Sequence, residues 1–115
     1  MTMPEVKISN LSQRVYACCS QIPEGSVSTY KHIADFLGIS PRIVGQSLKN
    51  NPYAPKVPCH RVIASNFFIG GFQGEWGTGE KIFLKKDILA KEGISFNHKG
   101  YLLENLRDKV FSKFC

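Results

Sequence analysis

Residues 28–52 read S-T-Y-K-H-I-A-D-F-L-G-I-S-P-R-I-V-G-Q-S-L-K-N-N-P, and this stretch decides the fold. Ser28 is a good cap for a short helix over residues 29–37, and Gly38 can end that helix in the left-handed conformation. Its inward-facing residues are expected to be Ile33, Phe36 and Leu37. If a second helix starts shortly after Gly38, the two short helices are joined by a tight glycine turn.

That second helix is predicted from Ser40, a capping residue, with Pro41 at the favoured first position. It runs through R-I-V-G-Q-S-L-K and stops at Asn50-Asn51-Pro52. The pair is typical of a helix-turn-helix, and a plain αα-hairpin has the same spacing. Both alternatives stay open at this point.

The flanking sequence predicts a mainly helical protein with little β-structure. Asn10 could cap a first helix with an apolar stripe of Leu11, Val15, Cys18 or Cys19, and Ile22. Residues 62–64 could form a short strand, and the glycine-rich aromatic stretch after them a short strand plus a mobile loop. Residues 78–92 are predicted as a helix with four inward residues, Ile82, Leu84, Ile88 and Leu89. A small hairpin over residues 97–100 and a final amphipathic helix (Leu103, Leu106, Val110, Phe114) would complete the chain.

Composition fits a single globular domain over residues 1–115, with a core of about 9–93 and a C-terminal extension of 94–115. The chain carries 43% hydrophobic and 21% charged residues, and no apolar run approaches a membrane span. The first eight residues contain no hydrophobic signal region. We therefore expect an intracellular monomer, in the cytoplasm of a prokaryote or the nucleus of a eukaryote. The net charge of +6 is a weak hint of a polyanionic partner.

The four cysteines do not form a disulfide or zinc pattern. Cys18 and Cys19 are adjacent on a helical pattern, Cys115 is the last residue, and no C-x-x-C spacing occurs. Cys18 and Cys19 are expected to be small buried hydrophobic residues. No metal and no cofactor are predicted.

Cys59 stands apart, in the stretch V-P-C-H-R-V-I of residues 57–63. A thiol attacks only as a thiolate, so it needs a nearby base or positive field. His60 is adjacent, but neighbouring side chains in an extended segment point apart, so contact requires a tight turn or a bridging water. Glu92 is a candidate acid to orient the histidine. From spacing alone, Cys59 is either a reactive residue or a buried structural one.

Four blocks of sequence resemble the O6-alkylguanine-DNA alkyltransferases, and they occur in that family's order. P-C-H-R-V resembles the active-site pentapeptide, and S-T-Y-K-H-I-A the first helix-turn-helix segment. P-R-I-V-G-Q-S-L-K-N-N-P resembles the recognition helix with its asparagine hinge, and K-K-D-I-L-A-K-E-G the C-terminal helix with its glutamate. The resemblance covers about residues 15–93 and implies direct, stoichiometric transfer of an alkyl group from guanine O6 to Cys59.

The resemblance also implies the residues of the reaction. Cys59 would be the alkyl acceptor in a cysteine–water–histidine–glutamate relay with His60 and Glu92. Tyr30 matches a tyrosine that hydrogen-bonds guanine N3, and Asn51 an asparagine that ties the recognition helix to the reactive loop. The substrate pocket would use the carbonyl groups of Cys59 and Val62, the Gln73 N–H and Phe72.

DNA binding follows from the same resemblance. The family binds double-stranded DNA through the minor groove and flips the alkylated nucleotide out of the duplex. Arg42 matches the arginine that fills the gap in the base stack, and Lys49 is a further candidate for the basic face, together with Tyr30. Arg61 is assigned to structure, as a salt-bridging residue. No membrane partner is expected.

Each assignment has a simpler alternative. Tyr30 could be a core aromatic, Arg42 and Glu92 solvated surface charges, and Asn51 an ordinary turn residue. Two other functions stay open: a lesion-binding relative without transfer activity, which usually carries tryptophan where Cys59 stands, and a small helix-turn-helix regulator. The sequence departs from the family pattern in a longer loop after Gln73 and in Phe72, where a tyrosine is common.

Overall fold

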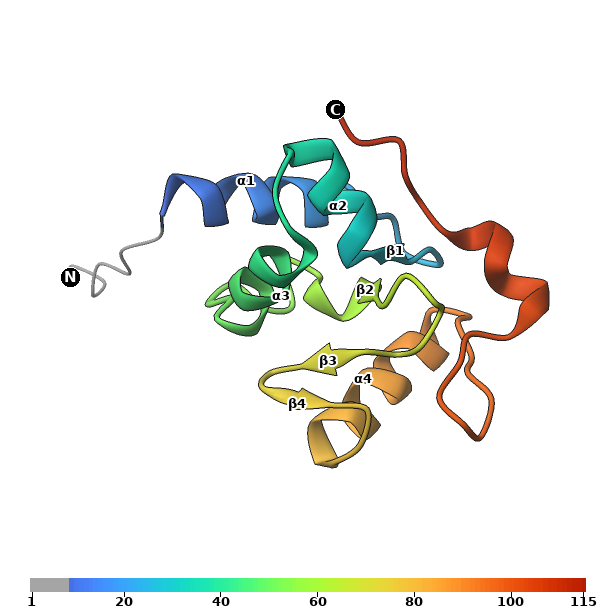
Figure 1. Ribbon diagram of the computed structural model, residues 1–115. Helices are drawn as coiled ribbons and strands as arrows, with labels where there is room; N and C mark the ends of the chain where they lie inside the picture. The colour runs from blue at the N-terminus through green and yellow to red at the C-terminus, as the bar shows by residue number, and fades with distance from the viewer. Residues whose placement is uncertain (1–8) are drawn as a thin grey trace.

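The computed structural model describes residues 9–115, and the expectation about a signal segment in residues 1–8 lies outside that range. Three helices, α1 (Asn10–Cys19), α2 (Tyr30–Leu37) and α3 (Pro41–Lys49), pack against one another. Helix α4 (Glu80–Lys91) lies on the other side of the short strands (Figure 1). The mainly helical fold with minor β-structure is as predicted.

The predicted helix-turn-helix stretch begins one residue later than expected. Thr29, not Ser28, is the N-cap of α2, because its side chain accepts a hydrogen bond from the His32 N–H at 3.0 Å. Gly38 ends α2 with φ of 70°, and Ser40 caps α3 with Pro41 in its first turn, both as predicted.

Four very short strands connect the helices. β1 (Ser28–Thr29) pairs in parallel with β2 (Val62–Ile63). This pairing places the strand that was predicted at residues 62–64 beside the start of α2. β3 (Gly71–Phe72) and β4 (Glu75–Trp76) form an antiparallel hairpin. The glycine-rich stretch that the sequence predicted as one strand plus a mobile loop is therefore a hairpin.

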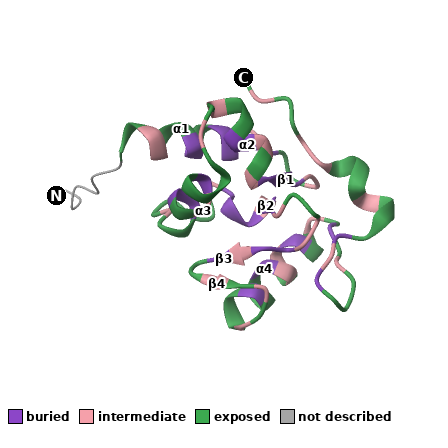
Figure 2. Cartoon of the chain, in the orientation of Figure 1, coloured by how far each residue is buried: buried purple, intermediate pink, exposed green. Residues whose placement is uncertain are grey.

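The buried hydrophobic side chains form two clusters. Figure 2 shows where the buried residues fall along the chain. The larger cluster packs α1, α2 and α3 against residues 57–63, and Cys18 and Cys19 are buried there as predicted. The smaller cluster contains Val27, Ile63, Leu89, Ile94 and Leu102. Within residues 9–115, no helix is long and apolar enough to cross a membrane.

Several predicted details of the helices were wrong. Ser9, not Asn10, caps α1, because its hydroxyl accepts from the Ser12 N–H. Phe36 and Leu84 were expected inside, but their exposed fractions are 47% and 45%. Helix α4 begins at Glu80 rather than near residue 78.

The C-terminal segment is not the amphipathic helix that was predicted. A 3₁₀ segment, η2 (Glu104–Lys109), is followed by extended chain that returns toward α1 and α2 (Figure 1). The Phe111 N–H donates to the Val27 carbonyl at 2.6 Å, and Gln21 and Cys115 exchange two hydrogen bonds. These backbone pairings favour an extended conformation over a helix. The predicted hairpin near residues 97–100 is confirmed, since Phe96 bridges to Leu102.

Candidate active site

Cys59 lies in a single tight turn, η1 (Cys59–Arg61). Pro58 precedes it, and the turn closes through hydrogen bonds from Cys59 N to Val57 O (2.8 Å) and from Arg61 N to Pro58 O (2.9 Å). From the sequence, contact between the Cys59 and His60 side chains required either a tight turn or a bridging water, and a tight turn is present. Only 7% of the Cys59 surface is exposed, but that residue lines an open cavity. Cys59 therefore lies where the core meets the cavity.

Behind the turn, one carboxylate holds two cationic or potentially cationic side chains. Glu92, the residue after α4, lies 3.1 Å from His60 Nε2 and accepts from Arg61 Nη2 at 2.8 Å and Arg61 Nε at 3.0 Å. Arg61 also donates to the Ile22 carbonyl at 2.9 Å, which joins the turn to the end of α1. This cluster contains the predicted contact between His60 and Glu92. It also contains a salt bridge of Arg61, which was predicted as a structural residue.

The cluster shifts the pKa of each member. Burial lowers the pKa of His60, and the opposing attraction of Glu92 does not fully offset it. Burial alone would raise the pKa of Glu92, but hydrogen bonds from Arg61 and His60 outweigh burial and hold that pKa below its usual value. At neutral pH the histidine is therefore neutral and the glutamate is ionised. A neutral imidazole can accept a proton, as a general base must.

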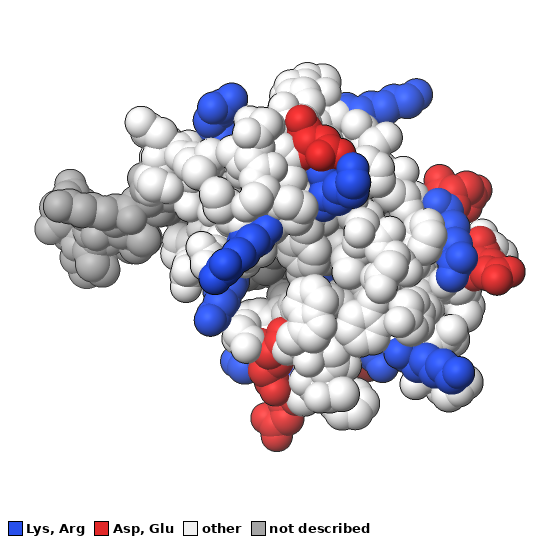
Figure 3. Space-filling model, in the orientation of Figure 1, with Lys and Arg blue, Asp and Glu red and all other residues white. Residues whose placement is uncertain are grey.

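The cavity in front of Cys59 has a volume of about 700 Å³. One side is formed by α3 and the start of α2, and the other by the β3–β4 hairpin. Figure 3 shows a hollow between these two parts, with Lys and Arg side chains projecting over the α3 side. Its lining includes Tyr30, Arg42, Lys49, Cys59, Phe72, Gln73 and Trp76.

Tyr30 is the first residue of α2, so its ring reaches back toward the hairpin. Its hydroxyl group lies 3.3 Å from both the carbonyl oxygen and the amide nitrogen of Gly71, and can donate to one and accept from the other. Burial raises the pKa of Tyr30 to about 12. The hydroxyl therefore keeps its proton at neutral pH and is available as a donor at the cavity wall.

The predicted DNA-contacting residues lie at the two ends of α3. Arg42 is exposed in the first turn and Lys49 is exposed in the last, and both line the cavity. Asn51, just beyond α3, donates from Nδ2 to the Val57 carbonyl at 3.0 Å and accepts at Oδ1 from the Tyr53 N–H at 2.9 Å. Asn51 thus joins the end of α3 to the segment that leads into Cys59.

The predicted pocket residues are placed differently from one another. Phe72 is buried in the core cluster and also belongs to the cavity lining. Gln73 is exposed at the turn of the hairpin with φ of 49°, and its Oε1 accepts from Lys81 Nζ. The carbonyl of Val62 accepts a 2.7 Å hydrogen bond from Lys85 Nζ, an interaction that the sequence did not predict.

Lys85 is the main residue that sequence reasoning missed. It is fully buried in α4, and its ammonium group donates to the carbonyls of Val62 (2.7 Å), Ile69 (2.6 Å) and Gly71 (2.9 Å). Burial lowers the pKa of Lys85 to about 7, against the attraction of Cys59 and Cys19. The signal in the sequence was its spacing, since Ile82, Lys85 and Leu89 fall on one helical face.

Residues 10–94 match the family model described as 6-O-methylguanine DNA methyltransferase, DNA binding domain. The chain belongs to this family. The matched residues include all four α-helices and the turn that carries Cys59. The match also favours a helix-turn-helix over a plain αα-hairpin for α2 and α3.

Two relatives illustrate the extent of the similarity. A methylated-DNA–protein-cysteine methyltransferase of Pyrobaculum aerophilum is 46% identical over 96 residues, covering 78% of this chain and 61% of that protein. One of Saccharolobus solfataricus is 49% identical over 74 residues, covering 64% and 44%. The chain thus spans about half the length of the curated relatives that it matches.

Solved structures show the same fold. S. pombe Atl1 in complex with damaged DNA containing O6-carboxymethylguanine has a TM-score of 0.72 at 32% identity, covering 92% of this chain and 98% of Atl1. Mycobacterium tuberculosis OGT in complex with DNA has a TM-score of 0.65 at 33% identity, covering 76% and 52%. The O6-methylguanine-DNA methyltransferase of Pyrococcus kodakaraensis has a TM-score of 0.64 at 38% identity, covering 75% and 47%.

Proposed function

We propose that this protein repairs DNA by transferring an alkyl group from guanine O6 to Cys59, once per molecule. The observation that carries the proposal is the position of Cys59. This residue lines a cavity of about 700 Å³, and the next residue, His60, has its Nε2 3.1 Å from the carboxylate of Glu92. That arrangement matches the pairing of a nucleophile with a base that a third group positions. The names of the relatives point to the same reaction.

The reaction is an in-line displacement at the alkyl carbon. The Cys59 proton passes to His60 through a water molecule, and the sulfur electron pair forms the new S–C bond. The O6–C bond breaks, and its electrons remain on the guanine, which Tyr30 stabilises by donating a hydrogen bond to N3. The Gln73 N–H would donate to O6, and the Cys59 carbonyl would accept from the exocyclic amine. The predicted part of Val62 in this contact is dropped, because its buried carbonyl accepts from Lys85 Nζ and Val62 does not line the cavity.

The transfer is stoichiometric because its product is a thioether. A thioether sulfur carries no acidic proton and is a poor leaving group, so Cys59 cannot be regenerated by the same chemistry. We propose that the reaction needs no metal or cofactor, since thiol, base and donor come from the chain itself.

DNA would bind across the α3 side of the cavity. The alkylated nucleotide must leave the duplex to reach Cys59, and Arg42 would fill the space left in the base stack. Lys49 would contact phosphate, so binding would depend on salt and little on sequence. We propose binding through the minor groove, which suits a protein that reads a lesion rather than a sequence. Complexes of Atl1 and of M. tuberculosis OGT with DNA support a DNA partner.

Incubation with an oligonucleotide bearing O6-methylguanine tests the proposal. Intact-protein mass spectrometry should detect the gain of one methyl group per molecule, and peptide mapping should place it on Cys59. DNA with unmodified guanine is the control. Tight, lesion-dependent binding without a mass gain would indicate a lesion-binding protein, and sequence-specific binding without lesion dependence would indicate a regulator.

The lesion-binding alternative has one observation in its favour. The TM-score with Atl1 is 0.72, whereas the TM-score with the P. kodakaraensis methyltransferase is 0.64. The residue at position 59 favours transfer, because a cysteine on the cavity wall can accept an alkyl group. The mass measurement separates the two functions directly.

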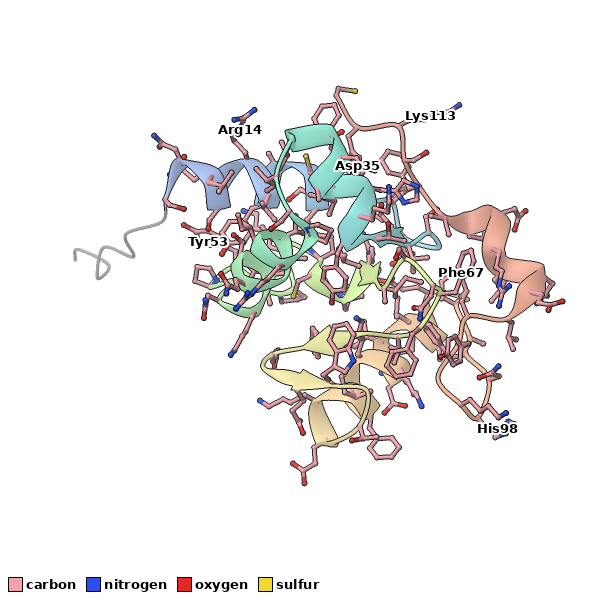
Figure 4. All side chains as sticks on the ribbon, in the orientation of Figure 1. Arg14, Asp35, Tyr53, Phe67, His98 and Lys113 are labelled. Carbon is pink, nitrogen blue, oxygen red and sulfur yellow. The ribbon has the colours of Figure 1, made fainter. Side chains whose placement is uncertain are left out.

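Replacing Arg42 by alanine should weaken binding of O6-methylguanine DNA on the order of ten-fold, because the gap in the base stack would lose its filler. The matched control is Arg14→Ala, since Arg14 is an exposed arginine on α1 that points away from α3 (Figure 4). Fluorescence anisotropy with labelled duplex measures both. Equal losses for the two variants would show that Arg42 acts only through its charge.

A further inference from the structure

The β3–β4 hairpin exposes an aromatic side chain at the mouth of the cavity that holds Cys59. Trp76, the single tryptophan of the chain, is 61% exposed and belongs to the cavity lining. Phe72 is the aromatic residue that the sequence predicted for the pocket. It is 7% exposed and packs in the hydrophobic core. The available aromatic surface at this wall therefore comes from Trp76.

The indole ring of Trp76 is held against the protein. It lies over Gly71, where an added Cβ would come within 3.0 Å of the indole Cε3. The rings of Tyr30 and Phe68 lie on either flank, each with its centroid 6.2 Å from that of Trp76. These contacts fix the ring on the protein side while most of its surface stays open to solvent.

The hairpin itself is anchored to α4. The Glu75 carboxylate accepts from the Lys81 N–H at 2.7 Å, so it satisfies a free amide in the first turn of the helix. A Cβ at Gly79, where φ is 114°, would collide with the same carboxylate. Lys81 Nζ in turn donates to Gln73 Oε1 at 3.2 Å. Such an anchored element can present an aromatic ring with little loss of entropy on binding.

The opposite lip of the cavity is basic and carries no aromatic residue of comparable exposure. Arg42 and Lys49 lie there, on α3, which suits the sugar-phosphate chain. A nucleotide that enters between the lips from the α3 side meets Tyr30 and then the hairpin. Aromatic rings bind nucleobases by stacking, whatever the base sequence.

We propose that Trp76 stacks on the extruded alkylguanine, so that the β3–β4 hairpin recognises the base outside the duplex. This inference rests on the proposed function for the identity of the base. It assigns Trp76 to binding and not to the chemical step, and it gives the additional length of the loop after Gln73 a role.

Trp76 provides its own optical signal for the test. In the Cys59→Ser protein, which keeps the lesion intact, DNA with O6-methylguanine should quench the tryptophan fluorescence. The same duplex with an abasic site at that position should quench it far less, because no base is present to stack.

Substitution supplies the second measurement. In the Cys59→Ser background, Trp76→Ala should weaken binding of O6-methylguanine DNA on the order of ten-fold and binding of abasic DNA much less. Trp76→Phe should restore part of the difference. In the protein with Cys59, Trp76→Ala should raise the half-saturating DNA concentration by more than it lowers the saturating transfer rate. Phe83→Ala, which removes a 67% exposed aromatic on α4 outside the cavity lining, is the matched control.

The outcomes separate the two hypotheses. The stacking assignment is wrong if Trp76→Ala weakens the binding of lesion DNA and of abasic DNA equally. It is also wrong if the two duplexes quench the tryptophan fluorescence equally. If the stacking results hold while the protein gains no methyl group, the transfer proposal fails and Trp76 remains a residue of a lesion-binding site.

Discussion

The Cys59→Ser protein will gain no methyl group from O6-methylguanine DNA on the time scale on which the unchanged protein reacts to completion. We expect a rate at least about 1000-fold lower, because a hydroxyl is a far weaker acid and nucleophile than a thiol. Binding of the lesion should persist, since the cavity walls and the basic face are unchanged. Mass spectrometry measures the transfer and anisotropy the binding.

Cys115→Ser is the control for this substitution, because Cys115 is an exposed thiol at the C-terminus that does not line the cavity. It should react at the rate of the unchanged protein. A methyl group appearing on the Cys59→Ser protein would place the acceptor elsewhere. Cys115 would then be the first candidate, because its thiol is exposed, whereas Cys18 and Cys19 are buried.

Replacing Lys85 by methionine should lower the thermal unfolding midpoint and slow alkyl transfer. Methionine has a similar length but no donor, so the carbonyls of Val62, Ile69 and Gly71 would lose their shared partner. A buried carbonyl without a partner costs about 1–3 kcal/mol. Transfer should slow as well, since these carbonyls lie in the segments that shape the wall of the cavity.

The pH dependence of stability distinguishes the lysine charge from simple packing. The pKa of Lys85 is lowered from 10.5 to about 7, so above pH 7 the unfolded chain binds a proton that the folded chain has released. Stability should therefore rise with pH, by about 2 kcal/mol between pH 7 and pH 9. Above pH 9 the raised pKa of the buried Cys19 opposes this rise, because its thiol ionises only in the unfolded chain.

Denaturant titrations at pH 7, 8 and 9 measure the effect. The rise should be present in the unchanged protein and in Lys91→Met, where an exposed lysine of the same helix is removed. It should be absent in Lys85→Met. An identical pH dependence in all three proteins would show that Lys85 keeps an ordinary proton affinity in the fold.

Local sequence signals located the helices, but long-range contacts chose between neighbouring residues. Ser28 and Thr29 can both cap a helix. The Ser28 hydroxyl instead donates to the Phe111 carbonyl at 2.6 Å, which leaves Thr29 to cap α2. That partner is 83 residues away in the chain, so no local pattern contains it.

Helix α4 illustrates the same limit for burial. Hydrophobicity predicted Leu84 inside, yet the interior position belongs to Lys85, because three main-chain carbonyls need donors there. The C-terminal residues have helical periodicity, but backbone pairing with Val27 keeps them extended. Propensity and periodicity do not include partners that only the folded chain brings together.

The candidate site was predicted mainly from resemblance. The order of the motifs pointed to Cys59, His60 and Glu92, and the fold brings the last two within 3.1 Å. Trp76 and Lys85 were missed for different reasons. Trp76 lies in a loop longer than the family pattern, and a lysine in a helix is usually assigned to the surface.

The sharing of Glu92 between His60 and Arg61 has a consequence for the proton that the proposed transfer removes from the Cys59 thiol. In an isolated histidine–glutamate pair, protonation of the imidazole cancels a negative charge. Here Arg61 already neutralises the carboxylate, so protonated His60 would add a net positive charge to a buried cluster. We therefore expect His60 to release that proton again rather than to store it, because burial disfavours the charged imidazolium.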